Sequence, residues 1–257
     1  AASIAPANPV LLDVGANKGY VAATFLALFS NRGVDAQRWH KSLVQYARPN
    51  GTVRYGYLDR DACGACQDCR SRPPQGHSRS GGSVHLLEML PSTRAILRHV
   101  ISELSLGDIV SVYDSAASNE TKIVPAPDAL WLNYGGTEYA SLQTSGAARR
   151  QRRSDPKRTL ALTTVDDLMA SRGLTTLYQV VVDTEGWDAL VLEGMASALQ
   201  HKRIEFVQFE HNVKKEYWRP LHREHRSLST VVARLYTMGY TCFILARHFI
   251  APISAEW

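Results

Sequence analysis

A glycine-spaced turn between two regular elements, near the start of the chain, is the feature that most constrains the fold. The short apolar run that begins at Val10 ends in the acid Asp13, and the turn Gly15 to Gly19 follows. The Ala- and Leu-rich segment Tyr20–Phe29 favours helix. Glycine lacks a Cβ, so the backbone can turn sharply and a ligand can lie against it, while the N–H groups of the first helical turn face an anionic group. The sequence therefore predicts a strand, a loop that holds a nucleotide-like cofactor, and a helix.

The spacing of this turn selects the class of cofactor. A dinucleotide fingerprint reads G-x-G-x-x-G, but Asn17 and Tyr20 stand at two of its glycine positions, which disfavours NAD. An acid followed by Gly-x-x-x-Gly is similar to motif I of class I S-adenosylmethionine (SAM) methyltransferases, and the wording Asp-Val-Gly-Ala-Asn-x-Gly resembles that of the FkbM family. The resemblance implies that the methionine end of SAM is cradled by Asp13, Gly15, Ala16, Asn17 and Gly19.

The second apolar strand, Val84–Glu88, ends in a carboxylate. In nucleotide-binding α/β folds, an acid at this position accepts hydrogen bonds from ribose hydroxyls, because its lone pairs can meet two adjacent donors. Glu88 fits that role, and the alternative is an exposed glutamate in front of a helix cap. In the FkbM family this acid is followed shortly by a proline and a helix, and Pro91 stands similarly here.

The third strand, Ile109–Tyr113, leads into small residues. The related fold places such residues against the adenine ring, because short side chains leave room for a flat base. The resemblance therefore assigns Ser115 and Ala116 to the adenine end of the cofactor.

A second strong motif covers Val180–Gly194. It closely resembles the family pattern Lys-x-Asp-x-Glu-Gly-x-Glu-x-x-x-Leu-x-Gly, with Val181 for the basic residue and Asp188 for the second glutamate. A β-branched run that ends in Asp183 and Glu185 predicts a buried parallel strand that delivers carboxylates to the ligand-binding edge of the sheet. The glycine that follows indicates that the strand stops there, so one acid meets substrate while the other supports the loop. Asp183 is also expected to contact the cofactor.

The next strand, Ile204–Phe209, is followed by Glu210, His211 and Asn212. Histidine is the side chain best suited to take a hydroxyl proton near neutral pH, and Glu210 would fix its tautomer. Alternatively, Asp183, Glu210 and Asn212 supply oxygen ligands to Mg²⁺. We favour the metal-free base, because most FkbM relatives are not read as requiring a metal.

Three thiols lie close together in the pattern Cys63-x-x-Cys66-x-x-Cys69. Thiolates at this spacing bind Zn²⁺ well, but a closed structural site takes four ligands. One disulfide within the cluster and one to the remaining cysteine is the oxidised alternative, and free thiols are the third. The fourth zinc ligand is unknown, and the candidates are His77, His85 and Cys242.

Composition and turn signals define the organisation of the chain. With 257 residues, 45% hydrophobic and 21% charged, it is long enough for a full core. We predict a single domain over 1–257, with insertions at about 34–82 and about 120–158, where turn signals are dense. No apolar run approaches the roughly 20 residues that span a bilayer. The expected fold is a class I methyltransferase (Rossmann-like) doubly wound α/β sheet, mostly parallel, with an antiparallel C-terminal hairpin.

Charge and aromatic residues bear on partners. The net charge is +5, and the basic run Arg149–Arg153 lies among Ser, Gly and Asp-Pro without aromatic residues, which favours a solvated loop over a nucleic-acid site. An acidic or sulfated substrate stays open as an alternative. The aromatic, glycine-rich segment Trp131–Leu142 suits a sugar or polyketide substrate, or a lid packed on the core. The oligomeric state is not indicated, and the compartment, cytoplasm or an organelle or secretory lumen, depends on the cysteine state.

Five motifs in the family order, between Val10 and Asn212, together predict the function. They are the glycine loop, Glu88, the segment Thr164–Leu168, the Asp-x-Glu-Gly turn and the strand before Glu210. The resemblance implies methyl transfer from SAM to a hydroxyl of a small molecule, a sugar or a glycan. His211 is the expected base, surrounded by Asp183, Glu185 and Glu210. The alternative is a non-catalytic binding or scaffold protein that keeps the methyltransferase fold.

Overall fold

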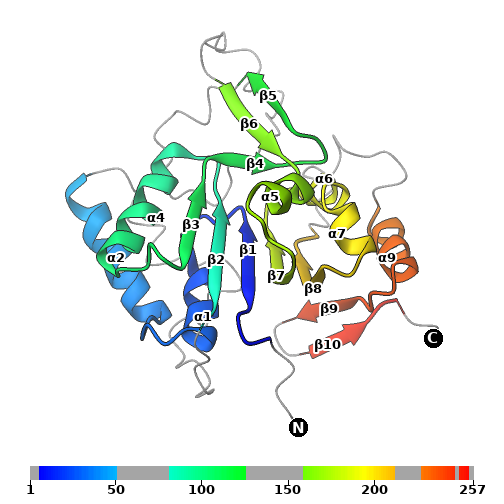
Figure 1. Ribbon diagram of the computed structural model, residues 1–257, viewed down its shortest axis with the longest axis horizontal. Coiled ribbons are helices and arrows are strands. Elements are labelled where there is room, and N and C mark those ends of the chain that lie inside the picture. Colours follow the sequence, from blue (N-terminus) through cyan, green and yellow to red (C-terminus); the bar gives the residue numbers. More distant parts are fainter. Residues whose placement is uncertain (1–5, 51–80, 126–158, 212–226, 247–248, 255–257) are drawn as a thin grey trace.

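A five-stranded parallel sheet forms the centre of the molecule (Figure 1). The computed structural model describes residues 6–50, 81–125, 159–211, 227–246 and 249–254. All four strand pairs are parallel, so the carboxyl ends of the strands meet at one edge, where open α/β sheets bind ligands. The sheet order is β3-β2-β1-β7-β8, with bounds β1 (Val10–Val14), β2 (Ser83–Leu87), β3 (Val110–Tyr113), β7 (Leu177–Val182) and β8 (Ile204–Phe209).

Helices cover both faces of this sheet, because successive residues of the buried strands point to opposite sides. Leu11 of β1 packs into one core cluster and Leu12 into the other. The doubly wound α/β fold predicted from the motifs is confirmed. The first face carries α1 (Tyr20–Phe29), α2 (Ala36–Asn50) and α4 (Pro91–Glu103), and the second carries α5 (Val165–Ser171), α6 (Asp188–Glu193), α7 (Ala196–Gln200) and α9 (Leu228–Thr237).

A second, smaller sheet stands at the carboxyl edge of the first (Figure 1). Its order is β4-β6-β5, with β4 (Ser115–Ala117) parallel to β6 (Thr159–Thr163) and β5 (Lys122–Pro125) antiparallel to it. Only Asp114 separates β4 from β3. The small residues predicted to border adenine therefore lie on a strand with fixed partners.

The residues directly after β6 begin helix α5 and stabilise its first turn. Thr164 Oγ1 accepts the Asp167 backbone N–H at 2.9 Å and caps α5. The Asp166 carboxylate accepts the N–H groups of Ser197 and Ala198 at 2.9 and 2.8 Å, at the start of α7. One short motif thus satisfies the orphan donors of two helices.

The C-terminal hairpin predicted from the sequence is present. Strands β9 (Phe243–Ala246) and β10 (Phe249–Pro252) pair antiparallel and form their own two-stranded sheet. Upstream of the hairpin, the Tyr240 hydroxyl donates to the Ile204 carbonyl of β8 at 2.6 Å. The hairpin is therefore tethered near the start of β8.

The two predicted insertions are described only in part. The first begins with α2, whose Trp39 and Leu43 are fully buried in the core of the first face. Residues 51–80 and 126–158 lie outside the described ranges, and with them the basic run and the aromatic, glycine-rich segment. Within the described ranges, every helix is too short or too polar to cross a bilayer.

Candidate functional site

One large cavity opens at the carboxyl edge of the parallel sheet. Its volume is about 1890 Å³. The residues predicted from separate motifs all line this cavity, although they come from five different segments. They are Asp13, Gly15, Ala16, Asn17, Gly19, Glu88, Ser115, Ala116, Asp183, Glu185, Glu210 and His211.

The glycine loop at the floor of the cavity has a left-handed backbone at three positions. The φ angles are 81° at Gly15, 45° at Asn17 and 74° at Gly19. A Cβ on Gly15 would lie 1.9 Å from the Asp183 carbonyl oxygen, which is far inside van der Waals contact. Glycine is therefore required at this position by the backbone of the neighbouring strand as well as by the turn.

Helix α2 supports the same loop from behind. Trp39 is fully buried, and its Nε1–H donates to the Lys18 carbonyl at 2.8 Å. A Cβ on Gly19 would lie 2.6 Å from the Trp39 ring. Sequence reasoning missed this contact, because an amphipathic helix in the sequence does not reveal which of its buried residues faces the loop.

Glu88 links the glycine loop to the end of β2. Its Oε2 accepts the Asn17 backbone N–H and its Oε1 accepts the Leu90 backbone N–H, both at 2.8 Å. The side chain is 5% exposed, so it is not the exposed glutamate of the alternative interpretation. Burial raises the pKa of Glu88, and these N–H bonds and the nearby Arg94 oppose that rise. Each carboxylate oxygen keeps a further lone pair for a hydroxyl donor.

The Asp-x-Glu-Gly motif forms a tight turn after β7. The strand ends at Val182, and the next residues leave extended geometry, with φ 53° at Glu185 and 94° at Gly186. The strand therefore stops before the two acids, in agreement with the stop that Gly186 indicates in the sequence. The Asp183 backbone N–H donates to the Val14 carbonyl at 2.9 Å, which ties this turn to the glycine loop.

A fully buried carboxyl group stands behind this turn. Asp188 Oδ2 accepts the Gly186 backbone N–H at 3.2 Å. Burial, with smaller contributions from the charges of Asp183 and Glu210, raises the pKa of Asp188 to about 7, although the nearby Thr184 hydroxyl opposes the rise. In the sequence Asp188 appeared only as a departure from the family pattern, and no signal there showed that it is buried.

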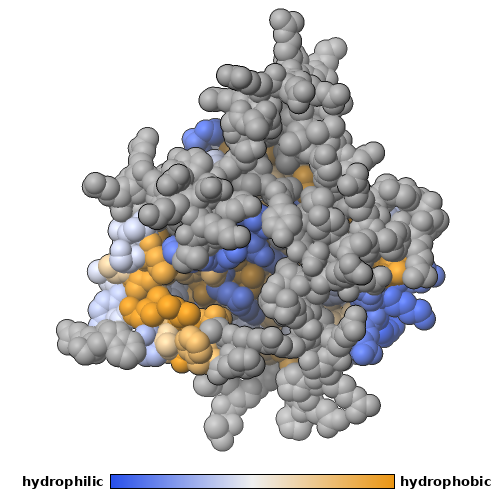
Figure 2. Space-filling model, turned by 180° about the vertical axis from the view of Figure 1, so that it is seen from behind, coloured by the Kyte–Doolittle hydropathy of each residue, from blue (hydrophilic) through white to orange (hydrophobic). Residues whose placement is uncertain are grey.

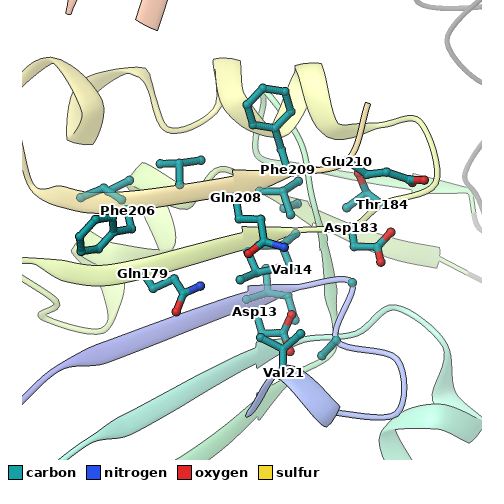
Figure 3. A pocket seen from close by; sticks show the side chains of 18 of the residues that line it. Asp13, Val14, Val21, Gln179, Asp183, Thr184, Phe206, Gln208, Phe209 and Glu210 are labelled. Atoms are coloured by element: carbon teal, nitrogen blue, oxygen red, sulfur yellow. The ribbon is translucent and has the colours of Figure 1, made fainter. Parts of the chain in front are cut away.

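Glu210 and His211 follow the adjacent strand β8. Asp183 and Glu210 extend from the ends of neighbouring strands at the same edge of the sheet (Figure 3). Burial raises the pKa of Glu210, and the nearby Asp183 adds to the rise. Burial lowers the pKa of His211, so its imidazole is neutral at pH 7 and can accept a proton.

The structure gives no support to a metal site. No group of three or more His, Cys, Asp or Glu side chains within the described ranges could hold a metal ion. His85 is paired with the Tyr113 hydroxyl through Nδ1 at 2.7 Å, and Cys242 lies in the irregular segment directly before β9. The other residues of the zinc and magnesium hypotheses lie outside the described residues: Cys63, Cys66, Cys69, His77 and Asn212.

Comparison with known protein families identifies the family of the chain that forms this cavity. The family model described as the methyltransferase FkbM domain matches residues 62–238, well over half of the chain. The chain belongs to the FkbM methyltransferase family. In this FkbM methyltransferase, the match includes Glu88, the Asp-x-Glu-Gly turn and Glu210–His211, and it begins after the glycine loop. Comparisons with curated proteins and with solved structures find no match.

Membership of the FkbM family implies SAM as methyl donor, and the residues present fit it. Asn17 Oδ1 is buried at the cavity and has no hydrogen-bond partner within the described part of the chain, so an ammonium or amide donor on a ligand would satisfy it. The remaining Glu88 lone pairs suit ribose hydroxyls. Ser115 and Ala116 add only small side chains to the lining.

Proposed function

We propose that this chain is a SAM-dependent O-methyltransferase that acts on a hydroxyl of a small molecule, a sugar or a glycan. The observation that carries the proposal is the shared cavity: the glycine loop and Glu88 line the same space as His211 and the acids after β7 and β8. The loop would hold the methionine end, Glu88 the ribose, and Ser115 with Ala116 the adenine.

His211 supplies the proton chemistry in this proposal. When bound, SAM supplies a methyl group on a sulfonium, so that the acceptor oxygen gains the methyl carbon as the sulfur–carbon bond breaks to a neutral thioether. His211 takes the hydroxyl proton, and the burial that lowers its pKa keeps the ring in the neutral form that can accept one. The nearby acids, Asp183 and Glu210, would stabilise the imidazolium that forms. The rest of the catalysis is orientation of the hydroxyl.

Calorimetric titration with SAM and product assays on His211→Gln test the proposal. We expect SAM affinity to stay within about twofold of the unsubstituted protein, while turnover with any accepted hydroxyl compound falls by about 10²-fold or more. His201→Ala is the matched control, because His201 is exposed at the end of α7, outside the cavity. Unchanged turnover in His211→Gln contradicts its role as base. Absence of SAM binding in the unsubstituted protein favours the scaffold alternative.

A further inference from the structure

The cavity does not end at the acidic groups. It continues along β7 and β8 to the C-terminal hairpin, where its lining includes Gln179, Phe206, Gln208 and Leu245. Its volume of about 1890 Å³ exceeds the roughly 300–1,000 Å³ of an ordinary small-ligand cleft. A nucleoside cofactor at the glycine loop would therefore leave room for a second ligand.

Strand register puts several of the side chains that line this second part of the cavity on one face of the sheet. Gln179 pairs with Phe206 and Val181 with Gln208, so these side chains share a face. Figure 3 shows Gln179, Phe206 and Gln208 on the same side of the sheet, with Phe209 on the other. Helix α1 contributes Val21, Leu28 and Phe29 to the lining on this face, and Phe206 is 50% exposed.

The polarity of the groove changes along its length. Asp183 and Glu210 lie at the end near the cofactor loop, and the amides of Gln179 and Gln208 lie along the strands. The far end carries the apolar side chains of Phe206 and the hairpin, and Lys202 and Glu205 near the start of β8 also line it. Figure 2 shows a hydrophilic area near the centre of the back of the molecule and an apolar patch beside it.

Exposed apolar side chains are concentrated at this far end. Those on β8, β9 and β10 are Phe206, Phe243, Ile244, Leu245, Phe249 and Ile250, and the other two within the described ranges are Ile123 and Tyr236. A monomer rarely exposes so many large apolar side chains together unless they bind something. Four of the six, Phe206, Phe243, Ile244 and Leu245, line the cavity itself.

We propose that this groove binds the methyl acceptor, and that the acceptor is amphiphilic, with a hydroxylated polar end and an apolar chain or ring system. This inference rests on the proposed function. The hydroxyl end lies toward Asp183 and His211, the amides of Gln179 and Gln208 bind polar groups behind it, and the apolar part packs on Phe206 and the hairpin. Continuity with the acidic end of the cavity, where Asp183 and Glu210 lie, favours this occupant over a second copy of the chain, which would have no use for that polar end.

Alkyl glucosides of increasing chain length, below their micelle concentration, are the probe. We expect affinity measured by calorimetry to rise from glucose through hexyl to octyl glucoside, because each added methylene is buried against the apolar end. Phe206→Ser and Leu245→Ser should each weaken octyl glucoside binding about tenfold and leave SAM affinity unchanged. Ile123→Ser is the matched control, because Ile123 is 74% exposed on β5 and lies outside the cavity lining.

The outcomes separate the groove from the cofactor site. Affinity that is independent of chain length, or an equal effect of Phe206→Ser and Ile123→Ser, overturns the acceptor groove whatever the SAM result. If sedimentation shows a dimer that Phe206→Ser converts to a monomer with undiminished octyl glucoside binding, the face is an interface between copies and the inference is overturned. If the unsubstituted protein does not bind SAM but its affinity for alkyl glucosides still rises with chain length, the proposed function is contradicted and the acceptor groove stands.

Discussion

Replacing Asp188 by asparagine should change how the stability of the protein depends on pH. Asp188 is fully buried behind the Asp-x-Glu-Gly turn, where its Oδ2 accepts the Gly186 N–H. Burial raises its pKa from 3.8 to about 7, and the nearby Asp183 and Glu210 add to the rise. Asparagine keeps the shape and the acceptor oxygen but carries no titrating proton.

The magnitude follows from the two pKa values. The folded protein holds the Asp188 proton more tightly than the unfolded chain, so this contribution to stability is complete below about pH 4 and is lost as the pH rises through 7. A shift of about 3 units at about 1.4 kcal/mol per unit gives about 4 kcal/mol. The free energy of unfolding of Asp188→Asn, minus that of the unsubstituted protein, should therefore rise by about 4 kcal/mol between pH 4 and pH 7.5.

Urea unfolding of both proteins at half-unit steps of pH measures this difference. Asp167→Asn is a control of opposite sign, because hydrogen bonds from the Thr121 and Thr164 side chains lower the pKa of the exposed Asp167. The Asp167→Asn substitution should lower the free energy of unfolding more at pH 7 than at pH 3. If the stability curves of Asp188→Asn and the unsubstituted protein run parallel from pH 4 to pH 8, the carboxyl group of Asp188 is not the buried, proton-holding group described above.

Two further substitutions test the cofactor loop. Gly15→Ala should lower the free energy of unfolding by more than about 3 kcal/mol, because its Cβ would meet the Asp183 carbonyl at 1.9 Å. The control is Gly173→Ala, which is also at positive φ but in open space and should lower the free energy of unfolding by only about 1 kcal/mol. Equal losses of the two variants in urea unfolding would contradict this prediction. Glu88→Gln places an NH₂ group against a backbone donor, so it should cost about 1–3 kcal/mol and weaken SAM binding at least tenfold in calorimetry. Unchanged values in both measurements would show that Glu88 does not connect the loop to β2.

Much of the fold could be predicted from the sequence, because its buried strands are apolar on both sides. Leu11 and Leu12 face opposite core clusters, so the apolar run Val10–Leu12 at the start of β1 indicates a strand that is buried on both faces. The strand ends were also predictable, since Glu88 and Asp183 interrupt such runs. This is why the residues predicted from separate motifs line one cavity.

The parts that could not be predicted depend on contacts between distant segments. Ser115–Ala117 has no strand pattern of its own, and its pairing with Ala161–Thr163 exists only in the folded chain. The support of the glycine loop by Trp39 likewise depends on how α2 is oriented against it. Asp188 is polar in the sequence, and only the packing around α6 makes it a buried group.

The central position of β1 has a consequence for synthesis on the ribosome. β1 is made well before its partners β2 and β7, and its Leu11 pairs with Gln179. The nascent N-terminal part must wait with one strand edge open, and the wall that Asp183 forms against Gly15 is missing until β7 emerges. A ligand that needs both sides of this site therefore cannot guide early folding, and can stabilise the protein only after β7 has left the exit tunnel.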